Sequence, residues 1–327
     1  MKRIAIGLII IIALNSRALC TEMVMLNGQF EQDEDQSQTE KSISQVEIEN
    51  QFEVTLTSQE DQVEDLKQDL DGLPLINRAL ASEHILINCI PKTGTHLVGK
   101  CLFLLTGKRH LLHAGVPDKA KLKELSKDNF FSTHTKYTRE HAREIEENNY
   151  KCFFILRDWR DQLVSFTYWV LKRDQEWPGL RYMEFNDLLM ELIERGAPVY
   201  SHFGPREDHA LFSLNGVDKF YRPYFAWMKH PAFYTVKFEN LVGPKGGGTL
   251  DAQLQEIKNI ARHIGIHLTD TQALKVSNEL FGGTWTFREG KIGDWKNHFK
   301  QKHIDAFKKR AGQFLIYYGK YEKDNNW

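Results

Sequence analysis

The sequence predicts an α/β fold with a central parallel sheet and helices on both faces. From residue 84 onward, short apolar segments alternate with longer mixed ones, and the apolar segments are HILINCI at 84–90, FFSTHTKY at 130–137, KCFFILRD at 151–158 and AFYTVKFENL at 232–241. Strands that are apolar throughout are typical of sheets buried on both faces, which are mostly parallel. The segments between them have the length of crossover helices.

Four helices are expected, over residues 95–105, 139–148, 161–174 and 250–265. The last carries a single apolar stripe made of Leu254, Ile257, Ile260, Ala261 and Ile264, the spacing of a helix packed on a core. Residues 182–229 are expected to be helical and are rich in aromatic side chains. Those side chains either belong to the core or line an apolar acceptor pocket.

Charge is distributed unevenly along the 327 residues. The whole chain has a net charge of −1, yet residues 23–75 contribute −12 and residues 76–327 contribute +9. Residues 21–75 are rich in Gln, Glu, Asp, Ser and Thr, a composition that buries too little apolar surface to offset the entropy of ordering. We therefore expect a disordered acidic arm, either simply solvated or masking the basic domain, and a folded domain over residues 76–327.

Residues 1–20 read MKRIAIGLIIIIALNSRALC, with a basic start, an 11-residue apolar run, and small residues at Ser16 and Ala18. This run is too short to span a bilayer and is typical of a cleavable secretory signal peptide, with cleavage expected after Ala18. An uncleaved anchor is the alternative. After cleavage no stable membrane insertion is expected, so the chain is expected to be secreted or exported.

The four cysteines lack the paired short spacings of a zinc site, and three of them fall in apolar runs. Buried free cysteines usually serve as small hydrophobic residues. We expect neither a metal site nor a disulfide framework, and no nucleic-acid partner.

A turn with the sequence PKTGT, residues 91–95, follows the first strand. A strand that ends in such a turn and continues into a helix points backbone N–H groups at one spot, at the positive end of the helix dipole. Phosphate or sulfate is the expected ligand. A Walker A loop has its lysine directly after its last glycine, whereas Lys92 precedes Gly94, which disfavours an ATP or GTP hydrolase. An ordinary strand-to-helix turn is the alternative.

Two further segments carry groups suited to phosphate. In RDWRDQLVSF, residues 157–166, Arg157 ends a strand and Ser165 lies in the following helix, so a guanidinium fork and a hydroxyl could bind one phosphate. In TFREGKIGDWKNHF, residues 286–299, Arg288 and the amide of Gly290 could close over a second. Each segment alone is also compatible with an ordinary surface element.

In this order and spacing, the three segments resemble the signature segments of the sulfotransferases that use 3′-phosphoadenosine 5′-phosphosulfate (PAPS), and KFENL at 237–241 resembles a fourth. The resemblance covers nearly the whole basic domain. It implies a sulfotransferase fold of the P-loop type, PAPS as co-substrate, and no requirement for a metal.

The resemblance also implies roles for single residues. Lys92 would reach the bridging oxygen between phosphate and sulfuryl group, within a 5′-phosphosulfate loop formed by Lys92, Thr93, Gly94, Thr95 and His96. The 3′-phosphate would be held by Arg157, Ser165, Arg288 and Gly290. Phe281 would help to sandwich the adenine, because Leu97 stands where many members have a stacking Trp.

His134, within FFSTHTKY, occupies the position where cytosolic members of the family place their general base. An ordinary histidine pKa of about 6.5 suits that task near neutral pH. Other histidines nearby in the sequence are His96, His110, His113 and His141.

Several positions depart from the family pattern. Ser132 replaces a Lys found in many cytosolic members, and Glu289 replaces the Lys of the usual Arg-Lys-Gly, which removes a positive charge beside the 3′-phosphate. Lys300 and Gln301 stand where the common dimer segment has Thr-Val, so the oligomeric state is left open.

The function expected is transfer of a sulfuryl group from PAPS to a hydroxyl or amine of a small-molecule or glycan acceptor, with Lys92 and His134 as catalytic residues. The alternatives are an exported nucleotide-binding protein on a degenerate sulfotransferase fold, and a P-loop kinase. The signal-like start conflicts with the mainly cytosolic supply of PAPS. The protein would act in a PAPS-containing compartment, enter the cytoplasm of another cell, or keep its N-terminus.

Overall fold

The computed structural model describes residues 84–327, except for 113–114, 118, 121, 123–126, 173–179, 181, 198–215 and 285–286. The expected signal peptide, residues 1–20, and the expected acidic arm, residues 21–75, lie outside the described residues.

A five-stranded parallel sheet forms the centre of the domain, as predicted. Its strands, in spatial order, are β2 (Arg109–Leu112), β3 (Asn129–Thr133), β1 (Ile85–Asn88), β4 (Lys151–Leu156) and β5 (Phe233–Lys237). Three of these strands fall within the predicted segments, and β3 begins one residue before its segment, at Asn129. The edge strand β2 was not predicted, because two of its four residues are polar and none of the four is buried.

The four expected helices are present with small shifts at their ends, as α3 (Thr95–Thr106), α5 (Arg139–Glu147), α6 (Trp159–Lys172) and α10 (Leu250–His263). The remaining α-helices are α7 (Phe185–Arg195), α8 (Val217–Tyr221), α9 (Phe238–Leu241), α11 (Asp270–Leu280), α12 (Trp295–His298) and α13 (Gln301–Phe314). Short helical turns complete the described part, namely η2 (Arg222–Lys229), η3 (Pro244–Gly246) and η4 (Leu315–Gly319).

The segment AFYTVKFENL required a correction, since it was predicted to remain extended to residue 241. The structure ends β5 at Lys237, and the next four residues form α9. Phe238 and Leu241 are both buried, and a helical turn places residues three apart on one side, whereas a strand would point them to opposite faces. The turn also places the Glu239 carboxylate to accept the Asp158 amide at 2.8 Å.

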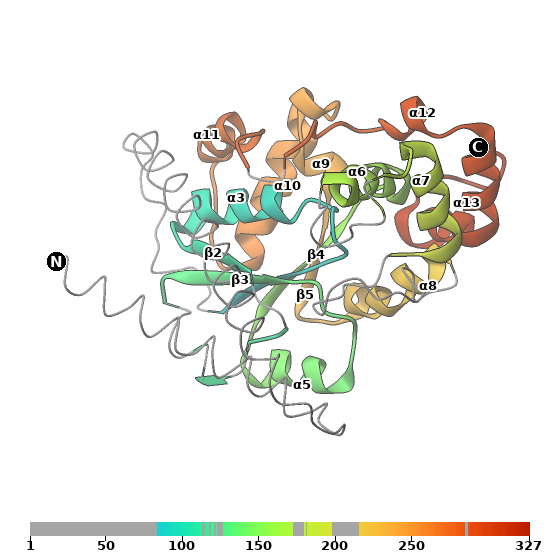
Figure 1. The fold of residues 1–327 in the computed structure, drawn as a ribbon. Coiled ribbons are helices and arrows are strands. Elements are labelled where there is room, and N and C mark those ends of the chain that lie inside the picture. The colour runs from blue at the N-terminus through green and yellow to red at the C-terminus, as the bar shows by residue number, and fades with distance from the viewer. Residues whose placement is uncertain are drawn as a thin grey trace, which may run out of the picture. The chain divides into compact units, whose positions relative to one another are not determined.

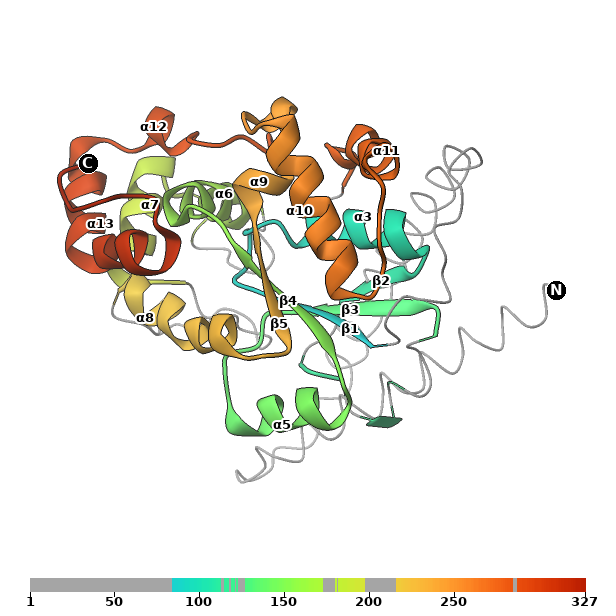
Figure 2. The same cartoon turned by 180° about the vertical axis from the view of Figure 1, so that it is seen from behind.

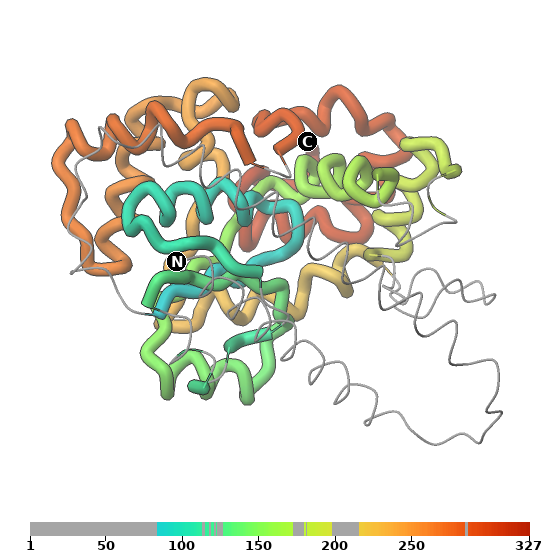
Figure 3. The backbone as a smooth tube through the Cα atoms, turned by 60° about the vertical axis from the view of Figure 1, so that its left-hand side comes forward, coloured from blue at the N-terminus to red at the C-terminus, as the bar shows by residue number. Residues whose placement is uncertain are grey.

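Helices cover both faces of the sheet, as predicted (Figures 1 and 2). Ile85 and Ile87 face the layer of α3, α10 and α11, while Leu86 between them packs with α5 on the opposite face. This alternation follows from the two-residue period of a strand. Figure 3 shows α3 beside the segment that contains α10 and α11.

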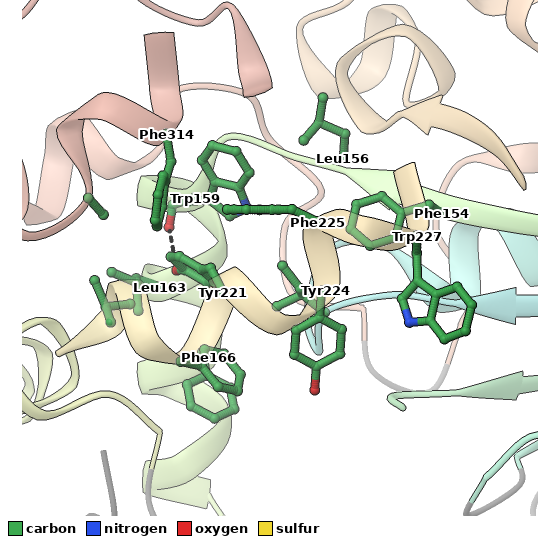
Figure 4. Close-up of a cluster of buried hydrophobic side chains, with 14 of the residues drawn as sticks. Phe154, Leu156, Trp159, Leu163, Phe166, Tyr221, Tyr224, Phe225, Trp227 and Phe314 are labelled. Atoms are coloured by element: carbon green, nitrogen blue, oxygen red, sulfur yellow. Dashed lines mark hydrogen bonds between the residues drawn. The ribbon is translucent and has the colours of Figure 1, made fainter. Parts of the chain in front are cut away.

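Aromatic side chains of the middle region form a core cluster with α6 and α13 (Figure 4). Trp159 of α6 packs against Tyr221 and Phe225, and Phe225 meets Phe314 edge-on with ring centroids 4.9 Å apart. The Tyr221 hydroxyl donates to the Trp159 carbonyl at 3.4 Å. The aromatic side chains named here therefore belong to the core, one of the two alternatives expected from the sequence, while those at residues 198–215 lie outside the described residues.

Within the ranges that the structure describes, no helix combines the length and the apolar character needed to cross a membrane. Three cysteines, Cys89, Cys101 and Cys152, are buried free thiols. Their positions in β1, α3 and β4 or directly beside them fit the expected role as small hydrophobic residues.

Candidate functional site

The three segments singled out in the sequence meet at the carboxyl edge of the sheet. β1 lies between β3 and β4, so the turn after β1 has His134, after β3, on one side and Arg157, after β4, on the other. Ligands of open parallel sheets bind at this edge.

The loop of residues 91–95 has the backbone geometry of an anion-binding turn. Lys92 and Gly94 both have positive φ, 69° and 120°. Thr93 is buried, and its hydroxyl donates to the Ile90 carbonyl at 2.7 Å, which holds the turn against the end of β1. α3 then begins at Thr95, and the first amides of a helix have no partner within it. These amides form a cradle for negative charge.

Only glycine suits position 94. A Cβ added there would lie 2.8 Å from the Phe238 ring, at a φ that other residues adopt only with strain. The guanidinium of Arg157 packs on this same ring, with its carbon 4.2 Å from the ring centroid. Gly94 therefore lets the loop approach α9 and, through Phe238, the site of Arg157.

Arg157 joins the 91–95 loop to the loop of residues 287–294. Its guanidinium donates to the Lys92 carbonyl at 3.1 Å and to the Lys291 carbonyl at 3.4 Å. The side chain is buried, and burial lowers the pKa of its guanidinium, although Asp161 and Glu239 act in the opposite sense. The three predicted anion-binding segments are thus connected through one side chain.

Arg288 lies close enough to Arg157 for their charges to repel. Its guanidinium donates to Asp294 and, at 3.2 Å, to Glu289, and it packs over the Tyr168 ring at 4.7 Å. The buried Nε atoms of both arginines have no hydrogen-bond partner among the described residues. Two orphaned guanidinium donors close together are the feature that fits a phosphate.

Glu289, one of the departures from the family pattern, forms ion pairs with Arg288 and Lys291. The Lys291 pair is 3.3 Å long. Glu289 therefore offsets the positive charges of Arg288 and Lys291 in the 287–294 loop.

Asp161, which the sequence reasoning missed, fixes the 287–294 loop to α6. Its carboxylate accepts the backbone amides of Gly293 at 2.7 Å and Trp295 at 2.8 Å, and its side chain is only 1% exposed. Burial raises the pKa of Asp161, and Asp158 acts in the same direction. The Gly-rich turn at η3 holds the loop from the other side, because the Ile292 amide donates to the Gly246 carbonyl at 2.9 Å.

Ser165 shares a face of α6 with Asp161 and Tyr168, since positions four and three apart on a helix are neighbours. Both of those residues contact the 287–295 segment, so Ser165 faces it as well. Its hydroxyl makes no hydrogen bond with a described residue, and the side chain is nearly buried. The structure thus brings Ser165 to the same region as Arg157 and Arg288.

Phe281 and Gly290 also lie together. Phe281 meets Phe287 edge-on, with ring centroids 5.3 Å apart, and a Cβ on Gly290 would come within 2.8 Å of Phe287. Lys100 of α3 donates to the Gly282 carbonyl at 3.1 Å, which ties the start of this segment to α3. Two phenyl rings therefore stand next to the loop that carries Arg288.

His134 has one ring nitrogen engaged and the other open. Nδ1 lies 2.7 Å from the Cys89 carbonyl, to which it can only donate, so the neutral ring keeps its lone pair on Nε2. Nε2 makes no hydrogen bond with the described residues. Burial lowers the pKa of His134, the bond to Cys89 opposes this, and the Lys92 charge lowers it further. The ring is therefore neutral at pH 7, as a general base must be.

Two other histidines, His96 and His110, lie near His134. His110 stacks on Phe130 at 5.0 Å, and its Nε2 lies 2.7 Å from the Ser132 hydroxyl. His96 meets His110 edge-on at 5.7 Å. Burial lowers the pKa of His96 to about 4 and that of His110 to about 3, with contributions from the charges around them. Both rings are neutral at pH 7.

The remaining histidine candidates differ in position. His141 lies in the first turn of α5, and His113 lies outside the described residues. No cluster of His, Cys, Asp and Glu with the arrangement of a metal site occurs in the described ranges.

No family model matches the sequence. The chain is 24% identical over 267 residues to a protein of Mus musculus named Sulfotransferase 6B1, a match that covers 72% of this chain and 77% of that protein. The fold is similar to the crystal structure of mouse sulfotransferase SULT7A1 complexed with PAP, with a TM-score of 0.52, 17% identity, and coverage of 74% of this chain and 87% of that one. The resemblance to sulfotransferases that the motifs indicated is thus confirmed in sequence and in fold.

Proposed function

We propose that this chain is a sulfotransferase that transfers the sulfuryl group of PAPS to a hydroxyl or amine acceptor by in-line displacement. One observation carries the proposal. Arg157 bonds to the 91–95 loop and to the 287–294 loop, so that Lys92, Arg157 and Arg288 belong to one linked anion-binding region, and His134 lies beside its Lys92 end. The relative of known fold was crystallised with PAP, the desulfated nucleotide.

The donor would bind across β1. Its 5′-phosphosulfate would lie on the 91–95 loop, and its 3′-phosphate would lie at Arg157 and Arg288, whose orphaned Nε atoms supply donors. Ser165, on the face of α6 that meets this region, would add a hydroxyl. The phenyl rings of Phe281 and Phe287 would receive the nucleobase.

In the reaction, the acceptor oxygen attacks the sulfur while Nε2 of His134 takes the acceptor proton. The bond between sulfur and the bridging oxygen breaks, and its electron pair leaves with the 5′-phosphate. Lys92 and the amides at the start of α3 stabilise that growing charge. Group transfer of this kind depends mostly on positioning and electrostatic stabilisation, which preformed donors provide.

The direct test is incubation of the full chain with PAPS labelled in its sulfuryl group and a mixed library of phenols, alcohols, amines and glycans. Label should pass to an acceptor without added magnesium. PAP binding with no transfer to any acceptor would favour the degenerate binding protein, for which the Glu289–Arg288 ion pair is the specific observation. Magnesium-dependent ATP turnover would favour a kinase.

His134→Ala tests the proposed base. Turnover should fall by about 10²- to 10⁴-fold, because a positioned general base contributes that much, while the Kd of PAP stays unchanged. His141→Ala, on α5, is the matched control and should retain turnover. Equal turnover of His134→Ala and the parent would remove His134 from the mechanism.

Export remains part of the proposal. Residues 1–20 have the pattern of a secretory signal, with cleavage after Ala18. Cell fractionation followed by N-terminal sequencing of the mature chain tests this. A mature chain that begins at Met1 in the cytosol would contradict it.

A further inference from the structure

Residues 320–327, here called the strap, lie next to the 287–294 loop and Trp295. In Figures 1 and 2 this end of the chain lies beside α12, which directly follows that loop. Tyr321 donates its hydroxyl to Glu239 at 2.9 Å, and Glu322 pairs with Arg160 at 2.7 Å. The strap therefore contacts both α9 and the start of α6.

Arg160 is the residue that joins the strap to the loop. It is only 2% exposed, and its guanidinium packs on two indoles, 4.0 Å from the Trp295 ring and 4.4 Å from the Trp327 ring, which meet each other edge-on with centroids 5.8 Å apart. Asp158 accepts a charge-assisted bond from it at 2.7 Å, which orients the guanidinium plane. A buried cation between two aromatic rings attracts both of them.

Trp295 connects this stacking arrangement to the anion site. Its amide donates to Asp161, and the residue before it, Asp294, accepts from Arg288. A continuous series of contacts thus runs from Trp327 through Arg160 and Trp295 to Arg288.

A cavity of about 210 Å³ lies between the strap, the start of α6 and the 287–294 loop, bounded by Tyr321, Glu322, Arg160, Gly293 and Trp295 among others. The strap is therefore not packed on the loop along its whole length. Its hold on the loop depends on Arg160 and on the edge-on contact of Trp327 with Trp295, while Phe307 and Lys308 of α13 hold Trp327 from the other direction. Loss of the Trp327 ring should therefore loosen the loop without removing the core of the domain.

We propose that the strap and Arg160 are positioning elements of the donor site, which hold Trp295 and thereby the loop that presents Arg288 to the 3′-phosphate. This inference rests on the proposed function. It predicts that loss of a strap contact weakens the binding of the nucleotide. The rate of the chemical step should stay unchanged, because His134 and Lys92 keep their positions.

Trp327→Ala in the full chain is the principal variant, with Trp327→Phe as the conservative one and Tyr317→Ala as the matched control. Tyr317 is 72% exposed and lies just before the strap. Isothermal titration with PAP should show a Kd about three- to thirtyfold higher for Trp327→Ala, from the usual strength of a cation–π contact. Trp327→Phe should recover most of the affinity, and Tyr317→Ala should match the parent.

Kinetics and hydrogen exchange separate positioning from a purely structural role. In Trp327→Ala the KM for PAPS should rise as the Kd does, kcat at saturating PAPS should stay within about threefold, and the amides of residues 287–295 should exchange faster. An unchanged Kd with only a lower melting temperature would overturn the inference. If the parent chain bound no PAP, the proposed function would fail. In that case, unchanged hydrogen exchange of the 287–295 amides in Trp327→Ala would also refute the positioning role of the strap.

Discussion

Asp161 provides the sharpest test of how the donor site is built, because it bonds to the segment that follows Arg288 and is assigned no contact with the donor in the proposed function. Its buried carboxylate holds the Gly293 and Trp295 amides at 2.7 and 2.8 Å, across more than 130 positions of sequence. Asp161→Asn keeps one acceptor oxygen and turns an N–H₂ group toward the second amide. Asp161→Ala removes both acceptors and leaves the two amides without partners.

The magnitude follows from these two bonds. A hydrogen bond to a charged group contributes about 1.5–3 kcal/mol. Asp161→Asn loses one such bond, roughly 2 kcal/mol, and Asp161→Ala loses both, about 3–6 kcal/mol. If the whole loss appears in donor affinity, at a factor of ten for each 1.4 kcal/mol, the Kd of PAP rises about thirtyfold for Asn and at least a hundredfold for Ala.

Titration calorimetry with PAP measures this directly, and initial rates against PAPS concentration divide the effect between KM and kcat. The expected result is a higher KM with kcat at saturation nearly unchanged, since Lys92 and His134 keep their contacts. Asp305→Asn, an exposed carboxylate on α13 that accepts from Gln301 in the same helix, is the control. A Kd for Asp161→Asn equal to that of the control would refute the idea that α6 positions the 287–294 loop.

Three other outcomes follow from the geometry. The pKa of His134 lies below 6.5, so its ring remains deprotonated as the pH falls toward 6.5, and kcat/KM should decline only at lower pH. An apparent pKa above 6.5 in the pH–rate profile would contradict this. Gly94→Ala should lower the free energy of unfolding by about 1–3 kcal/mol in chemical denaturation, since it combines strained φ with a clash on Phe238. Gly115→Ala, whose added Cβ would meet no atom within 4 Å, should not. Arg157→Lys should raise the Kd of PAP at least about tenfold by calorimetry, because an ammonium cannot bridge two carbonyls and a phosphate, and an unchanged Kd would place the 3′-phosphate elsewhere.

Local sequence patterns predicted much of the fold. The apolar runs that became β1 and β4 are buried on both faces, so their composition alone indicates central parallel strands. β2 was missed because an edge strand of four residues, RHLL, needs only one neighbour and has no apolar run. The end of AFYTVKFENL was misassigned because α9 is stabilised by a distant partner, the amide of Asp158.

Some residues of the candidate site could likewise be predicted from the sequence, and others could not. Arg157, Arg288 and Lys92 could be predicted, since strand ends and Gly-spaced turns are readable from neighbouring residues. Asp161 could not, because its partners are backbone amides whose identity leaves no trace in sequence. A buried carboxylate one helical turn before Ser165, on the face of α6 that already carried a predicted ligand, was the one available signal.

The order of the strands separates two tasks that the proposed reaction requires. β1 is central, so the loop that follows it can be reached from β3, which positions the neutral base His134, and from β4, which positions Arg157. Positive charge on the β4 side is offset by protein carbonyls and by Asp161, Glu289 and Asp294, and this permits two arginines to approach each other before any phosphate arrives. On the β3 side burial keeps His96, His110 and His134 neutral, so none of the three would compete with Lys92 for the negative charge of the transferring group in the proposed reaction. Donor affinity should therefore depend on the β4 half of the site and turnover on the β3 half, with Lys92 as the residue that belongs to both.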